Sequence, residues 1–89
     1  MKKYLMETYN VEYSSNAIVN AENLNKAFVE FIEYHGIPYP LEKSDIENMM
    51  KDFTLEKFIT YFEEINDRRV HRIYEIKETI FEKNFEAKE

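Results

Sequence analysis

The stretch NDRRVHRIYEIKETIF, from Asn66 to Phe81, decides which fold this chain adopts. As a helix it would carry a fair apolar stripe, whereas as a strand it would carry an apolar face interrupted by charge. The helical stripe comprises Val70, Ile73, Ile76/Lys77, Ile80 and Phe81, and the strand face comprises Val70, Tyr74, Ile76 and Ile80 with Arg72 and Glu78 among them. Periodicity alone slightly favours the helix.

Two further observations favour a strand. The segment RRVHRIYEI is rich in β-branched and aromatic residues, and the Asn66–Asp67 pair before it is a turn signal. An isolated N-terminal hairpin is also marginal in water and needs a third strand or a covering helix. We therefore predict an α+β fold of ββααβ order, in which two to three helices cover one face of a short three-stranded antiparallel sheet. The alternative is an N-terminal hairpin followed by an all-helical remainder.

The first part of the chain predicts that hairpin. Four side chains of KKYLMETYNVEY share one parity: Leu5, Tyr9, Val11 and Tyr13. The segment AIVNA follows after SSN, and a three-residue loop at Ser14–Asn16 would place Val11 opposite Val19. This loop is preferred to a two-residue one because Asn16 tolerates the left-handed conformation that the last loop position requires.

Amphipathic segments between the hairpin and the last strand predict helices: NLNKAFVEFIEYHG, SDIENMMKDF and LEKFITYFEEIN. Asn23 and Thr54 are expected to cap the first and the last of them. Ser44 and Glu47 have capping-box spacing at the start of the middle segment. Gly36 stands where a helix end needs a left-handed residue.

The composition is that of one small soluble domain, residues 1–89. Apolar residues make up 44% of the chain, and the absence of cysteine excludes disulfides and thiolate chemistry. No apolar run approaches the ~18 residues that could span a membrane, so we expect a cytoplasmic protein without membrane contact. The formal charge of −6 disfavours general binding to nucleic acid. Residues with AT-rich codons dominate, which indicates a low-GC bacterium, or a phage or plasmid within one.

The chain contains no motif of a catalytic or metal site. His35 and His71 have neither H-x-x-x-H nor H-E-x-x-H spacing, and His35 is interpreted as a helix-terminal residue that satisfies the last carbonyls. A chain with a single glycine cannot build a glycine-rich phosphate loop. We therefore predict no enzyme activity, no catalytic residues, no cofactor and no metal.

The three arginines, Arg68, Arg69 and Arg72, lie within five residues of one another. Guanidinium groups bind phosphate and carboxylate in a bidentate manner, so these residues and Tyr74 are candidates for contact with RNA or single-stranded DNA. The preferred interpretation is a solvated strand start whose arginines pair with nearby acidic residues: Glu63, Glu64 and Asp67.

The uncovered face of the predicted sheet is the candidate protein contact surface. If Val11, Val19 and Val70 face the helices, the opposite face exposes Tyr4, Met6, Ile18 and Ile73. Aromatic and methionine side chains among polar ones are typical of protein interfaces. The first or the third strand would also be a sheet edge, to which a partner can add a strand.

These observations favour a small, acidic, non-catalytic protein that binds another protein as an inhibitor or accessory factor. Acidic, cysteine-free chains of this size and composition are similar to the inhibitor proteins of phages and plasmids, anti-CRISPR proteins among them. Glu-rich helix faces would then replace a phosphate backbone in a basic groove of the target. The alternatives are an RNA- or single-stranded-DNA-binding module that uses the Arg68–Arg72 strand, and a structural homodimer.

Overall fold

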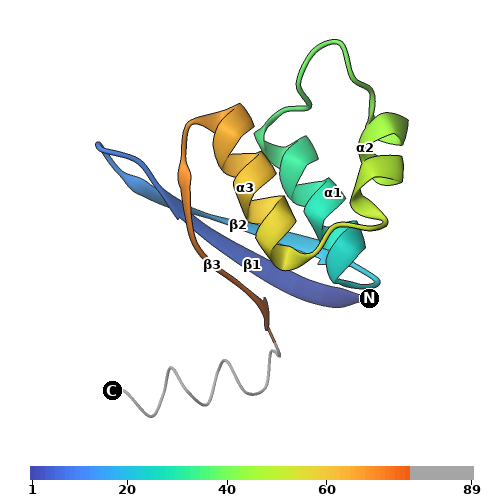
Figure 1. Cartoon of the computed structure of the whole chain (residues 1–89). Helices are drawn as coiled ribbons and strands as arrows, with labels where there is room; N and C mark the ends of the chain where they lie inside the picture. Colours follow the sequence, from blue (N-terminus) through green and yellow to red (C-terminus); the bar gives the residue numbers. More distant parts are fainter. Residues whose placement is uncertain (77–89) are drawn as a thin grey trace.

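A computed structural model, which describes residues 1–76, shows three strands in one antiparallel sheet and three helices (Figure 1). The elements in chain order are β1 (Lys2–Tyr9), β2 (Ser14–Ala21), α1 (Leu24–His35), α2 (Lys43–Met50), α3 (Leu55–Asn66) and β3 (Arg69–Ile76). The strand order is β2-β1-β3, and the helices lie on one side of the sheet. The predicted fold class is confirmed, with β2 and β3 as the sheet edges and β1 between them.

The deciding stretch forms a strand as far as Ile76. Residues 77–89 lie outside the described residues, and with them the tail FEKNFEAKE, which is predicted to fray or form a final turn. A bulge explains why the periodicity of the deciding stretch resembles that of a helix. Thr8 lies opposite Val70 but Glu7 lies opposite Arg72, so β3 has one extra residue at this point. The bulge brings Val70 and Ile73, three residues apart, onto the same core-facing side.

The hairpin turns at Asn10–Tyr13, so the loop predicted at Ser14–Asn16 is wrong. The Asn10 side-chain oxygen accepts hydrogen bonds from the backbone N–H groups of Glu12 (2.8 Å) and Tyr13 (3.0 Å). The Asn10 N–H donates to the Tyr13 carbonyl at 3.0 Å and closes the turn. Asparagine stabilises such turns through its own side chain, and this favours the earlier position. Val11, expected in the core, is fully exposed at the tip.

The earlier turn changes the register of β1 against β2 by an odd number of residues. Tyr4 lies opposite Val19 and Met6 opposite Ala17, whereas the sequence had suggested Val11 opposite Val19. Side chains alternate between the two faces of a strand, so an odd shift moves every β1 side chain to the other face. The even-numbered residues of β1 therefore face the helices.

The first and last helices begin and end as predicted. The Asn23 side chain accepts a hydrogen bond from the Lys26 N–H at 2.9 Å, and the Thr54 hydroxyl accepts one from the Lys57 N–H at 3.2 Å. Gly36, at φ +109°, ends α1, and its N–H donates to carbonyls of the last turn.

The middle helix is shorter than expected and begins differently. It ends at Met50, and its N-cap is Glu42, so the capping box predicted at Ser44 and Glu47 is wrong. The Glu42 N–H donates to the Asp45 side chain at 2.8 Å. This acidic pair takes the role that Ser44 was expected to play.

The core lies between the helices and the sheet. The rings of Phe28 in α1 and Phe58 in α3 stack with centroids 4.3 Å apart and planes 6° apart. Met6 and Ala17 contribute buried side chains from the sheet. The Asn25 amide donates to two carbonyls after and at the end of α2, those of Met50 (2.7 Å) and Phe53 (2.9 Å). These two hydrogen bonds tie α1 to the end of α2 and to the loop before α3.

Candidate functional site

The predicted contact residues do not form one exposed surface. Tyr4 and Met6 are buried in the core, and Ile73 packs against it, because the register places them on the helix side of the sheet. Ile18 alone of the four lies on the open face, with 54% of its surface exposed. The expected exposed patch is therefore wrong for Tyr4, Met6 and Ile73.

The open face instead displays the odd-numbered side chains of β1 and their cross-strand neighbours. Ile18, Leu5 and Tyr74 form one row across the three strands. Leu5 is only 7% exposed, although it lies outside the main core cluster. A polar row follows, in which Glu7 lies between Asn16 and Arg72. The face thus combines a short apolar row with an ion pair.

Each of the three arginines has its own set of partners. Arg68 donates to the Thr8 hydroxyl (3.0 Å) and the Ser15 hydroxyl (3.1 Å), and its guanidinium lies 5.2 Å from the centre of the Tyr13 ring. These contacts bind the start of β3 to the β1–β2 hairpin. Arg68 is therefore a structural link, which no sequence motif indicated.

The other two arginines form ion pairs. Arg69 bonds Glu63 at 3.3 Å, which confirms one of the predicted acidic partners. Arg72 pairs with Glu7 across the sheet, and its guanidinium carbon lies 4.6 Å from the centre of the Tyr74 ring. Of the four candidate nucleic-acid contacts, only Arg72 and Tyr74 are thus brought into contact with each other.

His35 lies at the end of α1 between two aromatic rings. Its ring makes edge contacts with Tyr34 and Phe62, at centroid distances of 5.1 and 5.0 Å. Its Nε2 is buried without a hydrogen-bond partner among the described residues, so it does not cap the helix through this atom. Burial, together with the positive charge of Arg68, lowers the pKa of His35 below its ordinary value.

Charge is divided between the helical layer and the sheet. Residues 22–67 contain eleven acidic and four basic residues, a net charge of −7. The hairpin and β3, residues 1–21 and 68–76, contain five basic and three acidic residues, a net charge of +2. Lys43 pairs with Glu30 and Glu33, but acidic groups remain in clear excess over the helices. A strongly negative surface attracts basic partners and repels phosphate.

The acidic layer contains a hollow along α3, which we call the α3 hollow. It has a volume of about 390 Å³ and is lined by Phe53, Glu56, Lys57, Thr60, Tyr61 and Glu64. The rings of Phe53 and Tyr61 meet edge to face with centroids 6.0 Å apart. Glu56 and Glu64 are exposed beside them. Sequence reasoning treated these glutamates as solvated helix surface and missed their aromatic neighbours, although Glu56, Thr60 and Glu64 follow a four-residue spacing.

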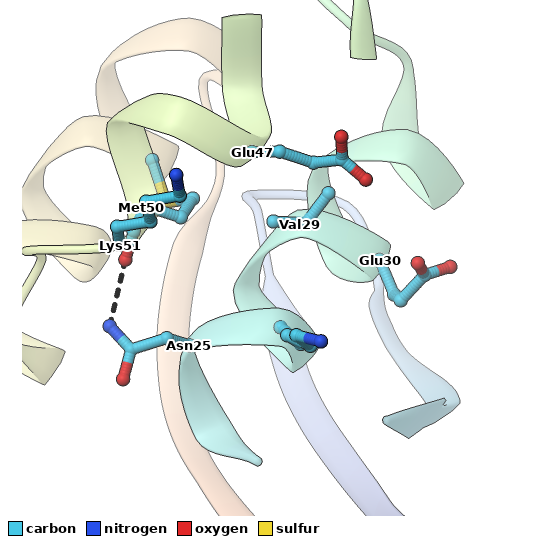
Figure 2. A pocket seen from close by; sticks show the side chains of 7 residues that line it. Asn25, Val29, Glu30, Glu47, Met50 and Lys51 are labelled. Atoms are coloured by element: carbon cyan, nitrogen blue, oxygen red, sulfur yellow. Dashed lines mark hydrogen bonds between the residues drawn. The ribbon is translucent and has the colours of Figure 1, made fainter. Parts of the chain in front are cut away.

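A second hollow, of about 300 Å³, lies between α1 and α2 (Figure 2). Val29 and Met50 contribute apolar surface, and the Asn25 amide reaches the Met50 carbonyl. Its charged lining carries both signs in equal number: Lys26, Lys51, Glu30 and Glu47. This balance favours no single class of charged ligand.

Comparisons with known proteins add no family or relative. No family model, curated protein or solved structure matches this chain. A function is therefore inferred from the chemistry of the surface alone.

The described range, residues 1–76, contains neither a metal-binding cluster nor a helix suited to cross a membrane. No three His, Asp or Glu side chains in this range come together in a way that could hold a metal ion. None of the helices in this range has the length and apolar character needed to cross a membrane.

Proposed function

We propose that this chain is a small, acidic, non-catalytic protein that binds a basic surface of another protein through its helical layer. The α3 hollow is the observation that carries the proposal, because it brings two aromatic rings together with two exposed carboxylates. An inhibitor from a phage or plasmid of a low-GC bacterium, acting on a nucleic-acid-binding target, is the biological role that this chemistry suits.

The lining of the α3 hollow suits an arginine or lysine side chain, because it combines two aromatic rings with two carboxylates. A cation over the face of an aromatic ring gains ~0.5–2 kcal/mol, depending on how far it is desolvated. Glu56 or Glu64, about two turns apart on α3, can accept hydrogen bonds from such a cation, an exposed pair adding ~0.2–1 kcal/mol. Lys57 lies at the same hollow and favours a partner that also carries an acceptor group.

The wider acidic layer supports association with a basic groove. A net charge of −7 over residues 22–67 speeds encounter with such a groove and makes binding depend on salt. A groove that normally receives a nucleic-acid backbone has this property. The sheet side is slightly positive, so the attraction is expected to orient the helices toward the partner.

The test is capture of partners from a lysate of a low-GC bacterium on the immobilised chain, read by mass spectrometry. A Glu56→Gln/Glu64→Gln variant should lose the proteins that the wild type retains, and raised salt should release them. The matched control is Glu12→Gln/Glu47→Gln, which changes the net charge equally at exposed positions away from the α3 hollow. Equal retention by all three proteins, or retention that salt does not weaken, contradicts the proposal.

A further inference from the structure

The outer edge of β2 lacks the features that normally prevent sheet edges from pairing. The strand SSNAIVNA has eight residues with no charge and no proline, and β1 pairs with it without a bulge. The other edge, β3, carries Arg69, Arg72 and Glu75 and has a bulge beside Arg72. Charged side chains and bulges protect edge strands against pairing with another chain. Among residues 1–76, one edge of this sheet therefore carries such protection and the other carries none.

The closing bond of the hairpin identifies which backbone groups of β2 point outward. Asn10 and Tyr13 form a hydrogen-bonded pair at the turn. Hydrogen-bonded and non-hydrogen-bonded pairs alternate along an antiparallel ladder. The residues whose N–H and C=O groups point away from β1 are consequently the even-numbered ones: Ser14, Asn16, Ile18 and Asn20.

A second copy of β2 fits this edge in one register better than in any other. We propose that two copies of this chain pair their β2 strands antiparallel across a twofold axis at Ile18. This register joins the outward backbone groups of both strands, places Ile18 opposite Ile18 of the other copy, and places Asn16 opposite Asn20. A shift by two residues would leave Ile18 opposite an asparagine. Identical edges that match themselves in this way form closed, isologous dimers.

The side chains support a second copy as the occupant. Because β2 contains no charged residue, its pairing with a second β2 places no like charges opposite each other. Like charges in that position would destabilise the ladder. The half-exposed Ile18 would contact its own copy and extend the apolar row of Leu5 and Tyr74 into a six-stranded sheet. The pairing uses the β2 edge and leaves the α3 hollow free.

The effect of salt separates this inference from the proposed function. Two chains of charge −6 repel each other, so screening should strengthen self-association. Binding to a basic partner through the helical layer should weaken under the same conditions. Self-association and binding to a basic partner can therefore each be absent while the other is observed.

Cross-linking tests the twofold register directly, because the chain has no cysteine of its own. Directly opposite Cα atoms in a hydrogen-bonded antiparallel pair are ~5.5 Å apart, within the range that a disulfide spans. Ile18→Cys should give a disulfide-linked dimer under mild oxidation, and a mixture of Asn16→Cys with Asn20→Cys should give the mixed dimer. Thr60→Cys, exposed on α3, is the control that should remain monomeric.

Sedimentation measures the association itself. The wild type should form a dimer at high micromolar concentration, more strongly as salt rises, and Ile18→Lys should be monomeric with an unchanged circular dichroism spectrum. The matched control His71→Lys, on the exposed part of β3, should still dimerise. A monomeric wild type at every concentration and salt overturns the inference, as does a dimer that Ile18→Lys leaves intact or whose cysteine variants do not cross-link.

Discussion

Arg72 and Glu7 join the two strands at opposite ends of the described chain through a two-point ion pair. The Arg72 Nε donates to Glu7 Oε1 at 2.8 Å, and Nη2 donates to Oε2 at 3.2 Å. The pair lies directly beside the bulge in β3. It therefore fixes the register of β1 and β3 where the ladder is irregular.

Glu7→Gln tests that pair through pH. The Arg72 hydrogen bonds and charge lower the pKa of Glu7, so its folded pKa lies below that of the unfolded chain. The stabilisation from the ion pair is complete at pH values above the pKa of an unfolded glutamate, ~4.3, and is lost as the pH falls through the lower pKa of Glu7 in the folded state. The melting temperature of Glu7→Gln should fall below that of the wild type at neutral pH, and the difference should close under acid. Glu12→Gln is the control, and a difference that persists at low pH would contradict the assignment.

His35→Phe should change the pH dependence of stability in a second window. Because the folded pKa of His35 is lowered, the unfolded state takes up a proton first, and stability is lost as the pH falls from ~6.5 through the folded pKa. Phenylalanine keeps the contacts with Phe62 and Tyr34 and has no buried, unbonded nitrogen. Thermal melts at successive pH values should show a smaller loss for His35→Phe than for the wild type. His71→Gln is the control, and equal losses in both proteins would refute the prediction.

Asn25→Ala should loosen the contact of α1 with the end of α2 and the loop before α3. The change removes two hydrogen bonds: the Phe53 carbonyl loses the donor that Asn25 supplies at 2.9 Å, whereas the Met50 carbonyl still accepts from the Phe53 N–H at 3.2 Å. An unsatisfied, partly buried carbonyl such as that of Phe53 costs ~1–3 kcal/mol. Urea unfolding should show a loss of about that size, whereas the exposed Asn48→Ala should lose much less. Equal stabilities of the two variants would show that the bridge contributes nothing.

Phe58→Ala should cause the largest loss of stability among these variants. Phe58 is fully buried, stacks on Phe28 and also contacts Phe31 and Phe62. Truncating such a ring typically costs ~3–5 kcal/mol. Chemical denaturation measures the change, with the exposed Tyr39→Ala as its control. A loss as small as that of the control would mean that the core repacks around the cavity.

Nucleic-acid binding, the alternative function, has its own test. Arg69→Ala/Arg72→Ala should weaken the binding of RNA or single-stranded DNA in a mobility-shift assay at low salt if the β3 surface is the contact. The proposed function expects no shift for the wild type, because both guanidiniums already bind glutamates of the same chain. A shift that the double variant abolishes would favour the alternative.

The strand at the end of the described chain could be predicted because the hairpin needed a third strand for stability. The internal geometry of this strand could not be predicted in the same way. The bulge beside Arg72 places Val70 and Ile73 on one side, a spacing that a helix also produces. Local periodicity cannot distinguish these two origins, and only the requirement of the whole sheet decided between them.

The hairpin register, and with it the exposed face, depended on one turn. Asn10 and Asn16 are both residues that tolerate turns, and the choice of Asn16 moved Tyr4 and Met6 to the wrong face. The β-branched and aromatic pattern did not correct this, because both parities of β1 are apolar. The α3 hollow was missed for a different reason: Phe53 comes from the loop before α3, so its contact with Tyr61 is tertiary.

The position of β1 between β2 and β3 affects how the protein is made. During synthesis β1 and β2 leave the ribosome together, but the other side of β1 remains unpaired until the chain has been translated through Ile76. Throughout that interval the nascent hairpin presents two free edges. A chaperone that shields nascent chains should therefore matter more for this protein than its small size suggests.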